Sequence, residues 1–463
     1  MKPERLHFLG ITGHAMRGVA LAARELGYEV TGSDPGAGPP GTEWLDEQGV
    51  TWYDTADPGH LKGVDRVIIS GHTRTDDPEV REAQRQGIPI TSFAQFVGEL
   101  TKDARTIVVS GTHGKTTITS LITWIFEVAG RNPDYLIGIK PHNFVSSVRL
   151  KNSTVAVIEG DEYRASQLDD RSKFAFYHPD VLVITSIEMD HPDFFENIED
   201  ITRRFADVVR GLPEDGRLLY AKQVPVDVAK LAGERRELYS GDHRNDRGNT
   251  DWHRGKAVKF TPDGLGFSLQ RNDDTYGTLE VPLYGKHNIL NSIAAAGVAL
   301  GEGISFDTVA EAMKTFKGAY RRFQCLTAPH APVRVIDDYA HHPTEVATTI
   351  EAAKLHFPGR VLAVFRPHTY SRTKELISEY HGAFKAADVA FIAPIQAARE
   401  AHLAGTVSSQ DIASQAGPHV AAFDDRTSLL EAMTAAARPG DTVLSMTVDG
   451  FDELAPELAD RLG

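Results

Sequence analysis

The segment VVSGTHGKTT, residues 108–117, places two glycines, a lysine and three threonines directly after a β-branched run. A loop of this composition between a strand and a helix can bind phosphate, because backbone N–H groups and the positive helix end face the anion. Lys115 would neutralise the β- and γ-phosphates, and the Thr116 hydroxyl would bind Mg²⁺. Only two residues separate Gly111 from Gly114, so the loop is shorter than the common GxxxxGK[ST] pattern. A phosphate site is predicted here in preference to a glycine turn with an exposed lysine.

A helix must follow this loop if the phosphate is to face its N-terminus. Ile118, Leu121, Ile122, Ile125 and Ala129 recur at the spacing that puts apolar side chains on one helical face. The strand TIVVS precedes the loop, so both flanking elements have the expected type.

Two acidic segments follow, each at the predicted end of a buried strand. VIEGDE (157–162) and SIEMDHPD (186–193) offer carboxylates where an open α/β sheet presents its ligands. Hard oxygen ligands suit Mg²⁺. Acidic loops are usually only solvated, but after a phosphate loop in the same domain these two are predicted to contribute metal ligands.

A separate glycine cluster, GITGHAMRG, lies near the N-terminus between a predicted strand and a helix. It contains Gly10, Gly13 and Gly18, and Asp34 follows Gly13 by 21 residues, near the spacing of a ribose-binding acid in dinucleotide folds. The glycines do not fit GxGxxG. Close packing of strand on helix and binding of nucleotide phosphates therefore remain equally good interpretations.

Strand-like and helix-like segments alternate throughout, which predicts α/β architecture. With 463 residues, the chain is long enough for about three domains. The expected division is 1–101, a Rossmann-like domain; 102–319, a P-loop ATPase domain; and 320–463, a second Rossmann-like domain. Predicted strands include 5–11, 28–34, 65–71, 105–111, 154–162, 180–190, 333–340, 360–367, 389–395 and 441–447. The polar stretch 241–255 is expected to be a loop.

Composition narrows the class of protein. The formal net charge of −15 argues against general binding to nucleic acid or anionic membranes, which requires dense basic patches. A single cysteine, Cys325, excludes an internal disulfide framework and a multi-cysteine zinc site. No apolar run approaches the length of a membrane span, and the N-terminus lacks a signal-peptide pattern. We therefore expect a cytoplasmic protein without nucleic-acid or membrane partners.

Six motifs, spread over nearly the whole chain, resemble those of the Mur ligases in the order that family shows. They are SGTHGKTT, EGDE, SIEMDHPD, YGKHNILNSIAAAG, GAYRRF and DDYAHHPTEV. The resemblance implies a UDP-sugar domain, a central ATPase domain and a C-terminal domain that receives an amine. It also implies an ATP-dependent amide synthesis at the carboxylate of UDP-N-acetylmuramate, through an acyl phosphate.

The resemblance assigns roles to individual residues. It makes Lys115, His191 and Arg322 catalytic, and Thr116, Glu159 and His191 the ligands of Mg²⁺. The implied ATP-binding residues are Gly111, Thr112, His113, Gly114, Lys115, Thr116, Thr117, His287, Asn291, Arg322, Asp338, Tyr339 and His341. Asn291 would contact adenine and Asp338 the ribose. The expected substrate-binding residues are Gly10, Gly13, Gly18, Asp34, Arg366, His368 and Arg372.

Different segments of the chain resemble family members that use different amines. Residues 38–50 and 141–180 resemble members that attach a recycled tripeptide, L-alanyl-γ-D-glutamyl-diamino acid, to UDP-N-acetylmuramate. FRPHTYSRTKEL, residues 365–376, resembles members that attach L-alanine instead. Thr12 and Ala15 stand where the family usually has glycine. The sequence favours the tripeptide, with Arg366 and Arg372 as bidentate partners for its carboxylates.

A departure from the family concerns the metal. Several Mur ligases carry a carbamylated lysine downstream of their DH motif, whereas no lysine occurs between His191 and Lys222. We expect Mg²⁺ to be held without a carbamate.

Two other functional classes use parts of the same sequence. An NAD-dependent oxidoreductase would use the segment from Gly10 to Asp34 but would leave the Lys115 loop unexplained. A non-catalytic nucleotide-binding regulator would keep that loop but need no acyl acceptor, and substrate-dependent phosphate release distinguishes it from a ligase.

Overall fold

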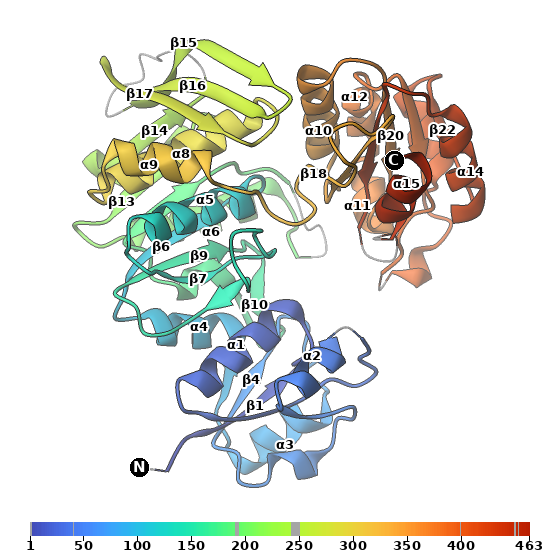
Figure 1. Cartoon of the computed structure of the whole chain (residues 1–463). Coiled ribbons are helices and arrows are strands. Elements are labelled where there is room, and N and C mark those ends of the chain that lie inside the picture. Colours follow the sequence, from blue (N-terminus) through green and yellow to red (C-terminus); the bar gives the residue numbers. More distant parts are fainter. Residues whose placement is uncertain are drawn as a thin grey trace.

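Three large sheets organise the computed structural model, which describes residues 2–39, 41–189, 194–241, 251–398, 400–448, 451 and 453–463. Each sheet and its helices form a separate unit. Figure 1 shows these units as the blue N-terminal part, the cyan-to-yellow central part and the orange-to-red C-terminal part. The predicted α/β class is confirmed.

The N-terminal unit is built on a five-stranded sheet in the order β3-β2-β1-β4-β5, and every pair in it is parallel. Its strands are β1 (Arg5–Leu9), β2 (Glu29–Ser33), β3 (Thr51–Tyr53), β4 (Arg66–Ile69) and β5 (Ile90–Ser92). Its helices are α1 (His14–Glu25), α2 (Gly41–Glu47), the short 3-10 turn η1 (Pro58–Leu61), α3 (Pro78–Gln86) and α4 (Phe93–Thr101). The strand order reverses between β1 and β4, and ligands bind at such a reversal point beyond the carboxyl ends of the strands.

The central unit contains a ten-stranded sheet in the order β17-β16-β15-β14-β13-β12-β6-β9-β7-β8. Its strands are β6 (Arg105–Ser110), β7 (Asp134–Leu136), β8 (Val148–Arg149), β9 (Val155–Gly160), β12 (Val181–Ile184), β13 (Arg217–Ala221), β14 (Arg236–Ser240), β15 (Asp251–Thr261), β16 (Gly264–Arg271) and β17 (Asp274–Val281). Its helices are α5 (Lys115–Val128), α6 (Ile198–Arg210), α7 (Val226–Lys230), α8 (His287–Gly301) and α9 (Phe306–Lys314). A small hairpin of β10 (Arg164–Ser166) and β11 (Asp169–Ser172) follows β9, and the turns η2 (Lys173–Phe176) and η3 (Gly233–Arg235) complete the unit.

The middle of this sheet is parallel and covered on both faces, which explains its continuous apolar strands. Ile107, Val108 and Val109 of β6 are fully buried. On α5, the predicted apolar face is confirmed, because Ile118, Leu121, Ile122 and Ile125 are also fully buried.

The C-terminal unit has a six-stranded sheet in the order β18-β19-β23-β20-β21-β22, parallel except for β18. Its strands are β18 (Gln324–Cys325), β19 (Arg334–Asp338), β20 (Val361–Phe365), β21 (Val389–Ile392), β22 (Val420–Ala422) and β23 (Thr442–Met446). Its helices are α10 (Pro343–His356), α11 (Tyr370–Glu375), α12 (Tyr380–Ala383), α13 (Ser409–Ala416), α14 (Arg426–Ala436) and α15 (Leu454–Leu462), with short 3-10 turns η4 (Ile377–Glu379) and η5 (Ala401–Leu403). Tyr380, Phe365 and Phe384 are fully buried beneath these helices.

One sequence-based expectation is partly wrong. The stretch 241–255 was expected to be a loop, but residues 251–255 belong to β15, and residues 242–250 lie outside the described part of the chain. β15 pairs antiparallel with β16, and β16 with β17, so a meander extends one edge of the parallel sheet. The polar composition misled the prediction because β15 lies inside the sheet, between β14 and β16, where its polar residues Asp251 and His253 are buried.

Among the described residues, no helix has both the length and the apolar character needed to cross a membrane.

The contact between α4 and η2 joins the N-terminal unit to the central one, and Gly98 makes it possible. A Cβ at this position would lie 2.1 Å from the carbonyl oxygen of Phe176. We predict that Gly98→Ala lowers the free energy of unfolding by about 2 kcal/mol, because the added methyl overpacks a backbone contact. Gly382→Ala in α12 is the matched control, since nothing lies within 4 Å of its Cβ position. Thermal unfolding of both variants tests this, and a Gly98→Ala midpoint at or above that of the wild type would contradict it.

Candidate active site

The predicted phosphate loop lies between β6 and α5, as the sequence indicated. Gly111 has a φ of 125° and Gly114 a φ of 82°, conformations that residues with a Cβ rarely adopt. There is also no space for a side chain at either glycine. A Cβ on Gly111 would lie 2.2 Å from the Oγ1 of Thr185, and one on Gly114 would lie 2.6 Å from the Oδ1 of Asn291. The loop therefore takes this shape only with glycine at both positions.

Lys115 is the first residue of α5, and oxygen atoms surround its ammonium group. Its Nζ donates to the carbonyl of Gly111 at 2.6 Å and to the carboxylate of Glu162 at 3.0 Å. Burial alone would lower the pKa of this amine, but the charges of Glu162 and Asp161 outweigh it and raise the pKa above its ordinary value. Lys115 is therefore cationic at physiological pH, as phosphate binding requires.

Two of the three predicted magnesium ligands lie together beside this loop. The Thr116 hydroxyl donates to the Oε1 of Glu159 at 2.8 Å, and the Oε2 of Glu159 accepts from the backbone N–H of Gly138 at 2.6 Å. Burial, with the nearby charge of Asp161, raises the pKa of Glu159. The third predicted ligand, His191, lies with residues 190–193 outside the described part of the chain.

A cavity of about 260 Å³ lies between the central and C-terminal units, next to the phosphate loop. The predicted ATP-binding residues that line it are His113, Gly114, Thr116, Thr117, His287, Asn291, Arg322 and Asp338. Asn291 donates from its amide to the Oδ1 of Asn288 at 2.7 Å, so its orientation is fixed by a neighbour on α8. Burial lowers the pKa of His287 to about 4, so this imidazole is uncharged at neutral pH.

Asp338 ends β19 at the edge of the same cavity. Its carboxylate accepts from the backbone N–H of Phe323 at 2.7 Å and from that of Ala340 at 2.8 Å. Burial raises the pKa of Asp338 to about 6. The guanidinium of Arg322 lies 5.9 Å from the centre of the Tyr339 ring. Asp338 therefore holds the segment that carries Arg322, and its predicted ribose contact stays a prediction.

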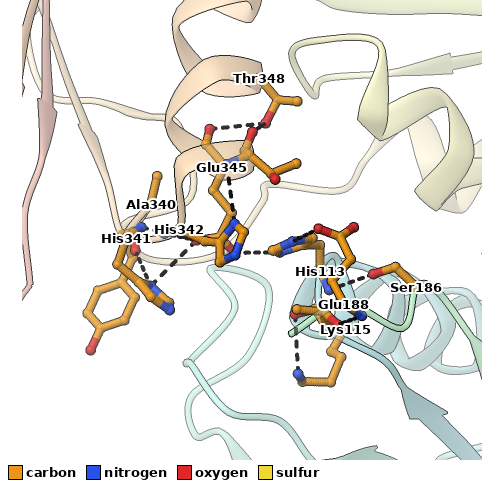
Figure 2. Close-up of polar contacts among 12 residues, drawn as sticks. His113, Lys115, Ser186, Glu188, Ala340, His341, His342, Glu345 and Thr348 are labelled. Carbon is orange, nitrogen blue, oxygen red and sulfur yellow. Dashed lines mark hydrogen bonds and ion pairs between the residues drawn. The ribbon is translucent and has the colours of Figure 1, made fainter. Parts of the chain in front are cut away.

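His113 links the phosphate loop to the first turn of α10 in the C-terminal unit (Figure 2). Its Nε2 lies 3.3 Å from the carboxylate of Glu188, and its Nδ1 lies 3.2 Å from the Oε1 of Glu345. The Oε2 of Glu345 accepts from the backbone N–H of His341 at 3.0 Å. The His342 ring centre lies 5.0 Å from that of His113. One carboxylate thus caps α10 and binds the central unit.

The charges around His113 determine its protonation. Burial alone would lower its pKa, but hydrogen bonds and charges from Glu188 and Glu345 raise it to about 10. Burial would raise the pKa of Glu345, but His341 and His113 hold it well below its ordinary value. The imidazolium is therefore the charge that balances two carboxylates between the units.

Three predicted substrate residues, Gly10, Gly13 and Asp34, line a cleft of about 660 Å³ at the carboxyl ends of β1, β2 and β4. Asp34 accepts from the backbone N–H of Thr12 at 3.1 Å and from the Thr12 hydroxyl. Gly18 does not appear among the described residues that line this cleft. A Cβ on Gly18 would lie 2.7 Å from the Cγ2 of Val148, so this glycine serves packing between α1 and β8.

A second cleft, of about 560 Å³, has Lys115 in its wall and is called here the cleft around Lys115. The predicted residues that line it are Thr112, Gly114, Lys115, Thr116, Glu159, Arg322, Tyr339, His341, His368 and Arg372. Arg366 is absent from its described lining. The Arg366 guanidinium lies 4.1 Å from the centre of the Phe451 ring, and its Nε donates to the carbonyl of Pro394 at 3.3 Å.

Glu345 was not predicted as a site residue, and Glu162 was predicted only within a segment of metal ligands, not as the partner of Lys115. Glu162 ends the EGDE motif, and its place three residues after Glu159 could have suggested a partner for Lys115. Glu345 lies 232 residues from His113 along the chain, so only the fold brings them together.

The raised pKa of His113 predicts how stability depends on pH. A group whose folded pKa exceeds its ordinary value of 6.5 stabilises the fold fully below that pH, and this stabilisation is lost as pH rises towards about 10. Between pH 7 and pH 9.5 we expect the wild type to lose on the order of 2 kcal/mol more than His113→Gln, whose side chain does not titrate. Urea unfolding at both pH values measures this, and parallel pH profiles would contradict it.

Comparison with known proteins agrees with this three-part site. Residues 5–105 match the model of the Mur ligase family, catalytic domain; residues 109–299 match the Mur ligase middle domain; and residues 321–447 match the Mur ligase, glutamate ligase domain. The chain is 33% identical over 471 residues to a UDP-N-acetylmuramate–L-alanine ligase of Anaeromyxobacter, covering 99% of this chain and 97% of that one.

Solved structures show the same architecture over the full length. The UDP-N-acetylmuramate-alanine ligase of Thermotoga maritima matches with a TM-score of 0.79 at 21% identity, covering 99% of this chain and 98% of that one. A murein peptide ligase of Psychrobacter arcticus matches with a TM-score of 0.70 at 26% identity, covering 99% of both. The chain therefore belongs to the Mur ligase family, the ATP-dependent ligases that form amide bonds in peptidoglycan synthesis.

Proposed function

We propose that the chain joins the carboxylate of UDP-N-acetylmuramate to an amine in the cytoplasm, using ATP and Mg²⁺. The observation that carries this proposal is the cleft around Lys115. Residues of all three units line it, among them His72 from the N-terminal unit, Lys115 from the central unit and Arg372 from the C-terminal unit. A reaction among a nucleotide sugar, ATP and an amine requires such a meeting point.

Each unit would then bind one reactant. We assign the UDP-sugar to residues 1–101, ATP to 102–319 and the amine to 320–463. The cleft that contains Gly10 and Asp34 also includes Tyr163 and Lys173 of the central unit, so a sugar bound there would extend towards the phosphate loop.

The residues around the loop fit Mg²⁺ and a triphosphate. Thr116 and Glu159 present oxygen atoms 2.8 Å apart, and oxygen ligands are those that Mg²⁺ prefers. When bound, Mg²⁺ would neutralise phosphate charge. We propose that no carbamylated lysine takes part in binding the metal. Lys173 makes its contacts as an unmodified amine: its Nζ donates to the Oδ2 of Asp161 at 3.0 Å and lies 2.9 Å from the hydroxyl of Tyr163.

The chain's own groups would stabilise charge during phosphoryl transfer. A carboxylate is a poor electrophile, so amide formation requires an acyl phosphate, which the amine then attacks as phosphate leaves. Lys115 would balance negative charge on the transferred phosphoryl oxygens, and Arg322 lies where it can approach the same group from the C-terminal side. Closure of the units would exclude the water that hydrolyses an acyl phosphate.

L-Alanine is the amine that we propose. His368, Thr369 and Arg372 line the cleft around Lys115, and they belong to the segment that resembles L-alanine-adding members. The charged segment 169–173, part of the region 141–180 that resembles tripeptide-adding members, lies elsewhere: Arg171 pairs with Asp169 at 2.7 Å, and Lys173 lines the cleft that contains Gly10 and Asp34. Among the described residues of the cleft around Lys115, none comes from 169–173. The relative from Anaeromyxobacter, which is named as an L-alanine ligase, also supports this choice.

The tripeptide remains the second candidate because of the size of the cleft. A volume of about 560 Å³ exceeds what a single small amino acid fills. The likeness to a murein peptide ligase supports the same alternative. An NAD-dependent oxidoreductase or a non-catalytic regulator is not supported, because the family assignment makes the chain an amide-forming ligase.

The role of Lys115 predicts a large effect on turnover. Lys115→Ala should lower ATP-dependent phosphate release by about 100-fold or more, because its charge is most valuable as the transition state spreads negative charge over phosphoryl oxygens. Lys230→Ala, at an exposed lysine, is the control. Release is measured with saturating UDP-N-acetylmuramate, L-alanine and Mg²⁺. Wild-type turnover in Lys115→Ala would contradict the role of Lys115 in phosphoryl transfer.

The choice of amine is tested by comparing two acceptors at equal ATP and Mg²⁺. We expect kcat/KM for L-alanine to exceed that for L-alanyl-γ-D-glutamyl-diaminopimelate by about 10-fold or more. UDP-N-acetylglucosamine, which lacks the lactyl carboxylate, is the control donor and should release no phosphate above background. A preference for the tripeptide would reverse the choice of amine and leave the ATP chemistry intact.

A further inference from the structure

A second cluster of ligand-type side chains lies inside the N-terminal unit, away from the phosphate loop. His7 comes from β1, His60 from η1 and Glu79 from the first turn of α3. The side chains of His7 and Glu79 are fully buried, and that of His60 is 15% exposed. The chemistry proposed for the cleft around Lys115 does not use these residues.

The three side chains converge on one carboxylate oxygen. The Oε1 of Glu79 lies 3.2 Å from the Nε2 of His7 and 2.9 Å from the Nδ1 of His60. All three ligand atoms lie within 4.8 Å of one another. A tetrahedral zinc ion with bonds of about 2.0–2.2 Å separates its ligand atoms by roughly 3.3–3.5 Å. The two contacts need to lengthen by only a few tenths of an ångström to admit the ion.

We propose that His7, His60 and Glu79 form a binding site for a divalent transition-metal ion, with Zn²⁺ as the ion that the ligand set fits best. Two imidazoles and one carboxylate are a set that zinc sites use. Magnesium is disfavoured, since it prefers oxygen ligands in octahedral geometry. The exposed edge of His60 leaves the fourth position to a water molecule.

The groups behind the ligands fit this role. The Nδ1 of His7 lies 2.8 Å from the hydroxyl of Thr31, which itself donates to the carbonyl of Leu6 at 3.5 Å. A hydroxyl that donates elsewhere accepts from Nδ1–H, which leaves the Nε2 lone pair of a neutral His7 facing Glu79. Metal-binding histidines commonly donate their other N–H to an oxygen in this way. The second oxygen of Glu79 accepts from the Ser33 hydroxyl at 2.5 Å.

His60 is held by a separate contact. Its ring stacks on that of Tyr53, with centres 3.8 Å apart and planes 7° from parallel. This stacking fixes the plane of an imidazole that comes from a short turn, and so keeps its Nδ1 directed at Glu79. All three ligands are therefore oriented before an ion arrives.

A metal ion in this cluster would affect the cleft that contains Gly10 and Asp34, here called the sugar cleft, because the cluster lies directly behind it. Ser33, which donates to Glu79, lines that cleft, as does Asp77, two residues before Glu79. Bound metal would tie β1, η1 and α3 together behind the cleft wall. It would act as a structural clamp on the N-terminal unit and would take no part in phosphoryl transfer.

The short contacts of Glu79 could instead come from a proton shared between an imidazole and Glu79. A measurement of metal binding distinguishes this explanation from a metal site. Chelator-treated full-length protein is titrated with Zn²⁺ in competition with a chromophoric chelator. Measurements compare the wild type with His60→Gln, with Glu79→Gln and with the control His330→Gln, at an exposed histidine. The decisive quantity is the difference in bound zinc between the wild type and each variant, because His113, Glu188 and His342 form another group that could bind zinc in all of them.

We expect the wild type and His330→Gln to bind one more zinc equivalent than His60→Gln and Glu79→Gln. Zinc should also raise the thermal midpoint of the wild type by about 2 °C or more, with a smaller rise in either site variant. His60→Gln changes a partly exposed residue and is the first variant to test. If His60→Gln does not fold, the comparison of the wild type with Glu79→Gln decides between the two explanations. Equal zinc binding in the wild type and a folded site variant would overturn the proposal.

Discussion

The contact of His113 with Glu188 and Glu345 is the interaction on which the geometry of the nucleotide site depends. One imidazolium balances a carboxylate from the central unit and another from the C-terminal unit. Because Glu345 also caps α10, this contact fixes the direction in which that helix approaches the phosphate loop. Asn291 and Asp338, from the two units that this contact joins, line the same cavity. A half-buried ion pair between units is strong enough to position them and weak enough to be broken during a catalytic cycle.

Local charge balance explains how a protein with a net charge of −15 could hold polyanionic substrates. Two of the acidic groups near the phosphate loop are each paired with a cation: Glu162 with Lys115, and Asp161 with Lys173. A bound triphosphate would compete with these carboxylates for Lys115. The carboxylates keep the lysine charged and oriented until phosphate replaces them, which limits the reorganisation required on binding.

Local patterns predicted the parts of the site that are contiguous in sequence, and missed the parts that are not. The phosphate loop, α5 and the strands around them follow from apolar periodicity and two glycines, because backbone geometry and burial act over a few residues. For the glycine cluster the sequence left close packing and ligand binding equally open, since glycine serves both, and Gly18 packs on Val148. Arg366 was expected at the substrate, yet its guanidinium lies over Phe451. Glu345, and the convergence of His7, His60 and Glu79, depend on how distant strands and helices are ordered, which no local pattern contains. The meander of β15 to β17 was missed although the turn sequences TPDG and RNDD between its strands are typical of hairpins.

We propose that ATP binds between the central and C-terminal units, with residues from both. Hydrogen exchange of backbone amides, measured with and without a non-hydrolysable ATP analogue and Mg²⁺, tests it most directly. We expect slower exchange in two separate segments, 111–117 of the phosphate loop and 338–345, from the end of β19 to the first turn of α10. Protection confined to the first segment, with 338–345 unchanged at saturating nucleotide, would contradict a site shared between the two units.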